Sequence, residues 1–475
     1  MTTFHLDFIL NATKGKLLSR HCEVFDGVGT DTRANLDGQL FIALKGDAFD
    51  AHIFVRKAVE KGAQALLVHS WKPENNDLLD RITVIQVPDT LLGLQSLARE
   101  YRRTFGGKVI GIAGSNGKTT SKEFTAALIS AFRKVHYSKG SFNNHWGVPF
   151  TLLATPEEAE VAVVEMGMNH AGELALLTKI AQPDVNVVTY VGIEHIEFFG
   201  TLDKIAEAEK EIYDEAPADS IRIYNLDNPY TRKMYAEAKE KFPKAKLMTF
   251  SSETPDRKLI DVSLKIKSLT MQSLTVQGLI GGVLGEATVP VFGLHNVTNL
   301  MVAASAGLAV GLEPEQIWQG LSRCETTWGR NQLVHTKSGA QILFDGYNSN
   351  PDSMRALVEN MRILEMKGKK VGIFGEMKEL GDQAPQMHRD VGVNVGSAGF
   401  DVIWFYGPHF EEFKAGVQSV NLKGNQFYTP DYDENLAKQI AGHLSQNDIA
   451  LVKGSRGMKL ERFVHVCEPL DFLNK

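Results

Sequence analysis

The sequence contains few cysteines. Cys22, Cys324 and Cys467 are the only three in 475 residues, and they lie far apart in the chain. An odd number of widely spaced cysteines suggests neither a disulfide framework nor a cysteine-based metal cluster. This usage is typical of proteins in a reducing compartment, so we expect a cytoplasmic protein.

Long apolar runs are also missing. The longest nearly apolar stretch, Leu300–Leu312, ends at Glu313, whereas a membrane-spanning helix needs about 20 apolar residues. We therefore interpret this stretch as a buried helix. The first residues do not show a basic region followed by an apolar core, so no secretion signal is visible. We expect no insertion into a membrane.

The chain has no excess of basic residues. It carries 51 basic and 57 acidic side chains, which gives a formal net charge of −6. This balance provides no broad basic face for a nucleic-acid backbone. We therefore expect no nucleic-acid partner.

The composition that remains is that of a globular protein with several domains. Hydrophobic residues make up 43% and charged residues 23% of the chain. Its length suits roughly three domains of ordinary size. We predict the α/β fold class, with a small α/β domain at 1–105, a central parallel sheet at 106–326 and a doubly wound domain at 327–475.

Alternating strand and helix patterns support this division. The β-rich stretch at 259–291 predicts a small antiparallel annex of the central domain. Helices are expected at 53–61, 90–105, 122–132 and 202–213. Strands are expected at 41–44, 65–68, 82–85, 109–113, 161–165, 185–191, 221–224, 342–345, 371–374, 402–405 and 450–452.

The segment Gly111–Thr120, G-I-A-G-S-N-G-K-T-T, is the strongest functional signal. It follows a predicted strand and leads into a predicted helix, which is the order that builds a phosphate-binding loop. Lys118 would reach the β- and γ-phosphates, and Thr119 would hold Mg²⁺. A strict Walker A motif has glycine where this chain has Ile112, so an ordinary glycine-rich turn is the alternative. The predicted nucleotide-binding residues of the loop are Gly114, Ser115, Asn116, Gly117, Lys118, Thr119 and Thr120.

Two polar side chains follow neighbouring predicted strands. Glu165 ends the strand at 161–165, and His195 comes shortly after the strand at 185–191. The carboxyl ends of parallel strands face the active crevice of a sheet, so Glu165 is placed to bind Mg²⁺ opposite the phosphate loop. Alternatively, Glu165 is a solvated residue at a strand end. A lone histidine is usually structural, but this placement favours a metal-binding role for His195.

Other candidates carry weaker signals. Asn296 and Asn299 share one helix face and could read a nucleotide base, although helix capping is the better explanation without further context. Asp345 ends the first strand of the third domain, where an acidic residue often binds ribose. Lys210 lies among glutamates on what is more commonly a solvated helix face. Lys453 and Arg456, past the last strand, suit an anionic substrate or a solvated turn.

Together these motifs resemble the Mur ligases, the ATP-dependent amide ligases of peptidoglycan precursor synthesis. The resemblance spans nearly the whole chain, with all three domains in family order. Gly111–Thr120 is similar to the family's phosphate loop. The resemblance implies metal-site roles for Thr119, Glu165, His195 and Lys210, and ATP-binding roles for the loop together with Asn296, Asn299, Arg330 and Asp345.

Two segments resemble the branch of the family that adds D-alanyl-D-alanine to a UDP-muramoyl tripeptide. They are the asparagine-rich loop Gly140–Pro149 and the segment Glu165–Glu173. In addition, Thr30–Arg33 with Phe41–Gly46 resembles a UDP-sugar-binding N-terminal module. The resemblance implies substrate-binding roles for Asp31, Thr32, Arg33, Asn143, Asn144, Tyr347 and Asn348.

The resemblance further implies the chemistry. ATP and Mg²⁺ would convert the tripeptide carboxylate to an acyl phosphate, which the amine of D-alanyl-D-alanine would attack. Lys118, His195 and Lys210 would be the catalytic residues. In family members, a lysine matching Lys210 can react with CO₂, which turns a cation into an anionic metal ligand. Carbamylation needs the neutral amine, and the neighbouring glutamates disfavour that form. We expect a monomer.

Other readings stay open at this point. The family member that adds the third amino acid usually has a D-N-P-R motif, whereas Asp227–Tyr230 lacks the arginine. A folylpolyglutamate synthetase is a second alternative, against which Thr30–Arg33 and the asparagine-rich loop argue. A nucleotide-regulated binding protein is a third, but the guanine-reading Asn-Lys-x-Asp motif is absent from the sequence. The identity of the third peptide residue is not encoded in any motif.

Overall fold

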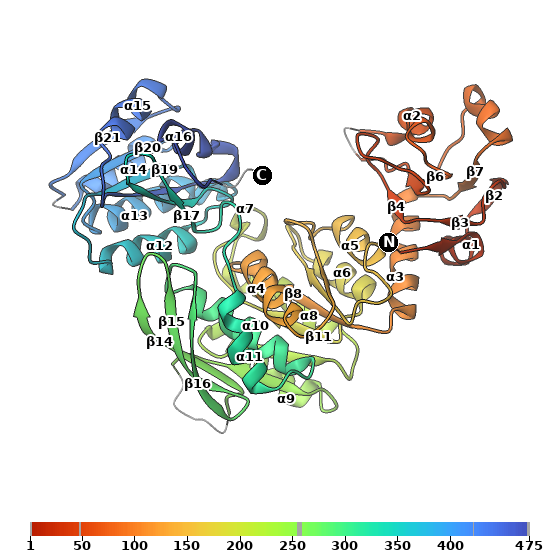
Figure 1. Ribbon diagram of the computed structural model, residues 1–475, viewed down its shortest axis with the longest axis horizontal. Coiled ribbons are helices and arrows are strands. Elements are labelled where there is room, and N and C mark those ends of the chain that lie inside the picture. Colours follow the sequence, from red (N-terminus) through yellow and green to blue (C-terminus); the bar gives the residue numbers. More distant parts are fainter. Residues whose placement is uncertain (1, 47–48, 254–258, 421, 473–475) are drawn as a thin grey trace.

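The computed structural model has three α/β lobes, each built around its own sheet (Figure 1). It describes residues 2–46, 49–253, 259–420 and 422–472. The central lobe lies between the N-terminal and C-terminal lobes (Figure 1). The predicted fold class is therefore confirmed. Among the described helices, none has the length and apolar character needed to cross a bilayer.

The N-terminal lobe has a five-stranded sheet in the order β2-β7-β6-β5-β4 and a separate pair, β1 and β3. Its long helix α3 also packs against the central lobe, where Arg102 forms an ion pair with Asp184 at 2.7 Å. The elements are β1 Phe4–His5, α1 Leu6–Thr13, β2 Lys16–Ser19, β3 Val24–Phe25, β4 Val28–Gly29, β5 Leu40–Ile42, α2 Val55–Glu60, β6 Ala65–Val68, β7 Thr83–Gln86 and α3 Thr90–Thr104.

The central lobe has a nine-stranded sheet in the order β16-β15-β14-β13-β12-β11-β8-β10-β9. Strands β8 to β13 are all parallel, as βαβ connections require. The strands are β8 Lys108–Ala113, β9 Val135–Tyr137, β10 Val161–Glu165, β11 Val185–Val188, β12 Ile221–Asn225, β13 Leu247–Phe250, β14 Val262–Leu269, β15 Leu274–Ile280 and β16 Val283–Val289.

The predicted antiparallel segment is present, but it is not a separate annex. Strand β15 pairs antiparallel with both β14 and β16, and β14 pairs in parallel with β13. They therefore extend the central sheet at one edge. The β-rich pattern predicted the antiparallel strands. The pairing of β14 with β13 depends on a tertiary contact that local periodicity does not encode.

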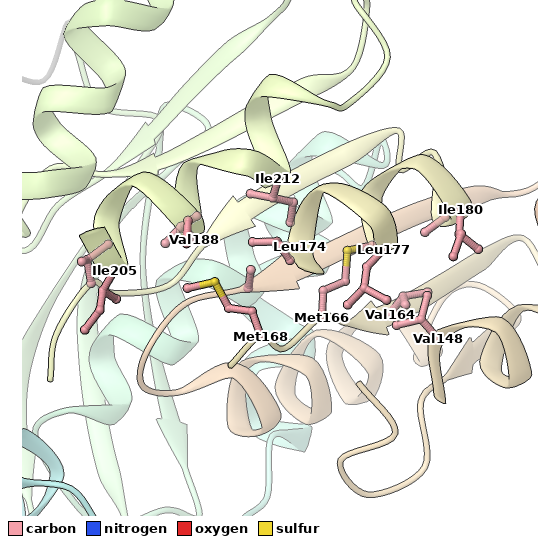
Figure 2. Close-up of a cluster of buried hydrophobic side chains, with 14 of the residues drawn as sticks. Val148, Val164, Met166, Met168, Leu174, Leu177, Ile180, Val188, Ile205 and Ile212 are labelled. Atoms are coloured by element: carbon pink, nitrogen blue, oxygen red, sulfur yellow. The ribbon is translucent and has the colours of Figure 1, made fainter. Parts of the chain in front are cut away.

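Helices cover both faces of the central sheet. Helices α4 and α10 share a core with one face, while α5, α6 and α8 pack on the other. Figure 2 shows side chains of the second core, among them Leu174 and Leu177 of α6, Ile205 and Ile212 of α8 and Val164 of β10. The helices are α4 Lys118–Ser130, α5 Gly147–Leu153, α6 Glu173–Ala181, α7 Ile196–Phe199, α8 Leu202–Asp214, α9 Pro229–Lys241, α10 Asn296–Ala309 and α11 Pro314–Gly320.

The C-terminal lobe has a six-stranded sheet in the order β17-β18-β22-β19-β20-β21, in which only the β17–β18 pair is antiparallel. Its strands are β17 Gln332–His335, β18 Gln341–Asp345, β19 Lys370–Gly375, β20 Val402–Tyr406, β21 Asn425–Thr429 and β22 Ile449–Lys453. Its helices are α12 Pro351–Ile363, α13 Ala384–Gly396, α14 Phe410–Gln418, α15 Glu434–Gly442 and α16 Glu461–Val466.

Candidate active site

One cavity of about 680 Å³ lies where the central sheet faces the C-terminal lobe. Both lobes contribute to its wall, so residues more than 200 positions apart in the sequence meet there. Of the residues singled out in the sequence, those that line it are Ser115, Asn116, Gly117, Lys118, Thr119, Thr120, Asn143, Asn144, Glu165, His195, Asn299, Arg330, Asp345, Tyr347, Asn348, Lys453 and Arg456.

The phosphate loop has a backbone that needs glycine at two positions. Gly114 and Gly117 have φ values of +124° and +83°, a region that side chains disfavour. A Cβ atom on Gly114 would lie 2.9 Å from the backbone nitrogen of Thr189, and one on Gly117 would collide with Oδ1 of Asn299. Glycine is therefore needed at these two positions because the loop backbone passes close to Thr189, just after β11, and to Asn299 of α10. Ile112, in contrast, replaces the usual Walker glycine.

Lys118 starts helix α4 and is held inside the loop. Its Nζ donates to the Gly114 carbonyl at 2.6 Å and to Oε2 of Glu194 at 2.6 Å. Burial disfavours the ammonium, but the nearby carboxylates of Glu194 and Glu209 outweigh it and raise the pKa of Lys118. The lysine is thus a fixed positive charge at the cavity wall.

Thr119, the next residue, lies at the centre of a polar network. Its hydroxyl donates to Oε1 of Glu165 at 3.1 Å and accepts from Nη2 of Arg330 at 3.1 Å. Asn143 donates to the same Glu165 oxygen at 2.8 Å. The other oxygen, Oε2, is buried without a hydrogen-bond partner and has only Lys122 as an ion-pair neighbour, at 3.7 Å. A hydroxyl and an under-used carboxylate oxygen are ligands that Mg²⁺ favours.

His195 connects the two lobes. Its Nδ1 lies 2.5 Å from Oε2 of Glu379 in the C-terminal lobe, and its Nε2 lies 3.8 Å from Oε1 of Glu194. The hydrogen bond from His195 lowers the pKa of Glu379 despite partial burial. The histidine therefore lies at the cavity wall between two carboxylates.

The structure does not bring Lys210 to the cavity, so the expected metal-site role of this residue is corrected. Its Nζ pairs with Asp214 at 3.2 Å and with Glu237 of α9 at 3.6 Å. Successive helix residues point about 100° apart, and the inward face of α8 is occupied instead by Glu209. Burial raises the pKa of Glu209 to about 8, and the charge of nearby Lys118 opposes this rise.

Asn296 and Asn299 do not form the paired base-reading amides considered from the sequence. Asn296 is buried, donates to the Phe292 carbonyl at 2.7 Å and accepts from Nδ2 of Asn299 at 2.9 Å. Asn299 also accepts from the Ser121 hydroxyl at 3.0 Å. Asn296 therefore fixes the orientation of Asn299, which alone of the two lines the cavity.

The C-terminal lobe supplies the opposite wall. Asp345 forms an ion pair with the buried ammonium of Lys453. Arg330 stacks on the ring of Tyr347 at 4.3 Å from its centroid, and the Tyr347 hydroxyl donates to Ser141 of the central lobe at 2.8 Å. Asn348 accepts from the backbone N–H of Ser349 through its side chain. The wall thus offers both an acidic group and fixed cations.

The remaining predicted substrate residues lie elsewhere or act locally. Asp31, Thr32 and Arg33 belong to the N-terminal lobe and do not line the cavity. Hydrogen bonds from Arg33 lower the pKa of Asp31 to about 2. Asn144 lines the cavity and also accepts from the backbone N–H of Gly147 at 2.9 Å, at the start of α5.

A second polar cluster in the N-terminal lobe joins Asp50, His52 and His69. Both ring nitrogens of His52 are already engaged: Nδ1 lies 2.6 Å from Oδ1 of Asp50, and Nε2 accepts from the backbone N–H of His69 at 3.0 Å. Burial lowers the pKa of His52. Because a metal would have to displace these hydrogen bonds, we interpret this cluster as structural.

Sequence reasoning missed several residues of the cavity. Glu194 adjoins His195 and was recognisable as another acidic residue past a predicted strand. Glu379 follows β19 in the same way, and its role depends on the contact between lobes. Asn350 donates to Oδ1 of Asn116 at 2.8 Å, and Asp352 accepts from the backbone N–H of Ile193 at 2.8 Å. These contacts between lobes leave no local signal in the sequence.

The fold and this cavity together define a class of protein. A phosphate loop at the carboxyl edge of one parallel sheet faces charged residues at the carboxyl edge of another. This is the arrangement of a nucleotide-dependent enzyme whose active site is assembled from two domains.

Comparison with known proteins identifies the family. Three family models match in chain order: the Mur ligase family catalytic domain at 24–102, the Mur ligase middle domain at 112–307 and the Mur ligase glutamate ligase domain at 329–456. The chain belongs to the Mur ligase family.

Individual relatives agree along the whole length. The chain is 38% identical over 462 residues to the UDP-N-acetylmuramoyl-tripeptide–D-alanyl-D-alanine ligase of Bacillus subtilis, with 96% of each protein covered. It is 32% identical to the ligase of the same name from Escherichia coli, with 93% of this chain and 94% of the relative covered.

Solved structures give the same result. A crystal structure of MurF from Acinetobacter baumannii superposes with a TM-score of 0.86 at 30% identity, covering 98% of each chain. MurF ligase from Thermotoga maritima in complex with ADP gives a TM-score of 0.77 at 26% identity, covering 93% of this chain and 96% of that one. A folylpolyglutamate synthase from Mycobacterium tuberculosis, at 17% identity and a TM-score of 0.59, shares the fold alone.

Proposed function

We propose that this chain joins D-alanyl-D-alanine to UDP-N-acetylmuramoyl-tripeptide, with ATP converted to ADP and phosphate, in peptidoglycan precursor synthesis. The observation that carries the proposal is the match to the Bacillus subtilis ligase over 96% of both chains. The cavity supports it, because the phosphate loop and the cationic wall of the C-terminal lobe meet there. The chain is thus an ATP-dependent ligase.

The chemistry requires activation of a carboxylate. An amine does not displace oxide from a carboxylate, so the γ-phosphoryl group is first passed to the terminal carboxylate of the tripeptide. The amine of D-alanyl-D-alanine then attacks the acyl phosphate, and phosphate leaves as the amide forms. Since the carboxylate and ATP are both negatively charged, neutralisation and positioning dominate the catalysis.

Lys118 and Arg330 are placed to neutralise phosphate oxygens. Lys118 extends from the phosphate loop, and Arg330 reaches across from the C-terminal lobe to Thr119. We assign Mg²⁺ to Thr119 and Glu165, with His195 close by, because the buried Oε2 of Glu165 has no hydrogen-bond partner. When bound there, Mg²⁺ would supply positive charge that neutralises phosphate oxygens.

Further roles follow from position. The loop backbone from Gly114 to Thr120 cradles the phosphates, and Asn299 and Asp345 lie where they can orient the nucleotide. We assign the peptide to the part of the cavity that Asn143, Asn144, Tyr347 and Asn348 line. We assign the UDP group to the N-terminal lobe around Asp31, Thr32 and Arg33, which lies outside this cavity.

We also propose that the enzyme works in the cytoplasm, where ATP and UDP-activated precursors are made, and that it acts as a monomer. Both lobes that form the cavity belong to one chain, so no second copy is needed to complete it.

The test measures ADP release and product mass together. With Mg²⁺–ATP and UDP-muramoyl-tripeptide, the protein should release ADP over many turnovers only when D-alanyl-D-alanine is added, and mass spectrometry should then show the UDP-muramoyl-pentapeptide. Parallel reactions with lysine- and diaminopimelate-containing tripeptides would identify the third residue.

Two further reactions separate the alternatives. UDP-muramoyl-dipeptide with lysine or diaminopimelate tests the third-residue-adding activity, and a folate with glutamate tests the folylpolyglutamate reaction. Product in either of these, with none from the tripeptide, would overturn the proposal.

A further inference from the structure

Helix α8 turns a carboxyl group toward the back of the phosphate loop. Glu209 is 3% exposed and lies on the same helix face as Ile205 and Ile212, which point into the core in Figure 2. The backbone N–H of Gly114 and the positive charge of Lys118 both favour its ionised form. Burying a carboxyl group in an apolar core costs free energy unless hydrogen bonds or an opposite charge compensate for the lost water.

One oxygen of this carboxyl group has no partner. Oε2 of Glu209 is buried and makes no hydrogen bond with any described residue. Oε2 of Glu194 accepts a hydrogen bond from Nζ of the same Lys118 at 2.6 Å. The carboxyl groups of Glu194 and Glu209 therefore both act on Lys118, and Oε2 of Glu209 has no hydrogen-bond partner among the described residues.

The neighbouring lysine has a different role. Lys210 is on the adjacent face of α8, where Asp214 and Glu237 hold its ammonium. These ion pairs favour the charged amine and raise the pKa of Lys210, although partial burial opposes this. A carbamate forms only on a neutral amine, and here it would have to form beside two carboxylates that repel it.

We propose that Glu209 takes, in this chain, the place that the resemblance assigned to a carbamylated lysine, so that phosphoryl transfer needs no CO₂. A carbamate and a carboxylate each present two oxygens that share one negative charge. In its ionised form, which a bound cation favours, a glutamate on the inward face of α8 supplies that group without a covalent modification. Glu209 is then a positioning residue, which acts on Lys118 and on a cation bound in front of it. This inference rests on the proposed ligase activity.

The first test asks whether CO₂ matters. Wild-type activity should change by less than twofold between CO₂-free buffer and buffer with added bicarbonate, and Lys210→Ala should keep at least one third of it. Nuclear magnetic resonance of the full chain with ¹³C-labelled bicarbonate should show no carbamate signal, with or without Mg²⁺ and an ATP analogue. A bicarbonate activation of fivefold or more, or a carbamate signal that disappears in Lys210→Ala, would overturn the proposal.

The second test replaces the Glu209 carboxyl group by an amide of nearly the same shape, which cannot become anionic. Glu209→Gln should lower kcat at least 100-fold, whereas Glu207→Gln, on the exposed face of the same helix, should change it less than threefold. Calorimetry should show that Glu209→Gln weakens Mg²⁺-dependent binding of an ATP analogue about 10-fold and leaves binding of the UDP-tripeptide unchanged. A purely structural role would weaken both ligands together, and full activity in Glu209→Gln would also overturn the proposal.

Failure of this inference can be told apart from failure of the proposed function. If no UDP-peptide yields product, the ligase assignment fails, while the carbamate signal and the ATP-analogue binding still test Glu209. If product forms but depends on CO₂ or on Lys210, only the role of Glu209 is wrong.

Discussion

At the scale of single residues, Lys118 is the side chain on which the phosphate loop depends most. It is buried between the Gly114 carbonyl and the Glu194 carboxylate, so it is already positioned before a nucleotide arrives. A positive charge fixed in a site with little water stabilises developing phosphate charge far more than one in solvent.

We expect Lys118→Ala to lower kcat at least 100-fold, because acyl-phosphate formation loses this charge. The measurement is trapping of the acyl phosphate in a rapid-quench reaction without D-alanyl-D-alanine. Binding of the UDP-tripeptide should be unchanged, which shows that the variant is folded. Appearance of the acyl phosphate at the wild-type rate would contradict this role.

Gly117 allows a second prediction at the residue scale. Gly117→Ala adds a Cβ atom that collides with Asn299, whose amide is held by Ser121 and Asn296, at a residue with φ of +83°. Nucleotide binding should weaken at least 10-fold, and the melting temperature should fall, since such backbone strain costs about 1–3 kcal/mol.

The matched control is Gly282→Ala. Gly282 has a φ of +88°, but no atom lies within 4 Å of its added Cβ. This variant should lower the melting temperature while nucleotide binding stays as in the wild type. Equal loss of nucleotide binding in both variants would mean that the collision with Asn299 is unimportant.

At the scale of elements, helix α13 is attached to the end of β19 by a buried histidine. His388 lies within α13, its Nδ1 is 2.7 Å from the Ala384 carbonyl, and its Nε2 accepts from the backbone N–H of Met377 at 3.0 Å. Burial lowers the pKa of His388 to about 4, so the folded protein holds the neutral ring. The segment after β19 that contains Met377 continues to Glu379, which lines the cavity.

This histidine predicts how stability depends on pH. A histidine with a pKa of about 6.5 when unfolded and about 4 when folded stabilises the fold above pH 6.5, and this contribution is lost as the pH falls toward 4. Between pH 7 and pH 5 the loss is about 2 kcal/mol. Thermal unfolding at the two pH values should show a smaller drop in melting temperature for His388→Gln than for the wild type. An equal drop would mean that His388 does not control this dependence.

At the scale of the whole molecule, hydrogen bonds already join the central and C-terminal lobes. Tyr347 contacts Ser141, and Asn350 contacts Asn116. The N-terminal lobe contacts the central lobe through α3, and it lies apart from the C-terminal lobe in Figure 1. A substrate bound by its UDP group at one lobe and by its peptide at the cavity would span this gap.

We therefore expect the radius of gyration to decrease when an ATP analogue and UDP-muramoyl-tripeptide bind together. Small-angle scattering of the full chain measures it, and each ligand alone should give a smaller decrease, because domain closure needs both ends of the substrate path to be filled. An unchanged radius with both ligands would contradict closure.

The bounds of the helices and strands differ in how well the sequence predicts them. Strands β6 and β10 were predicted at their observed bounds, because each is a short apolar run, and α8 was predicted to within a residue, because its apolar residues follow the helical period. The expected strand at 185–191 ends earlier, at Val188, since the chain turns there toward the phosphate loop. Short strands such as β4 and β9 were missed, because so few residues carry no measurable alternation.

The sequence by itself determined the α/β class, the order of the elements and the phosphate loop, since these depend on periodicity and on residues that are neighbours in the chain. Only the tertiary structure decided that Glu209 and not Lys210 faces Lys118, that Asn296 turns inward, and that Glu379 meets His195. A one-residue change in helical phase turns a side chain by about 100°, and contacts between lobes join residues that no local pattern connects.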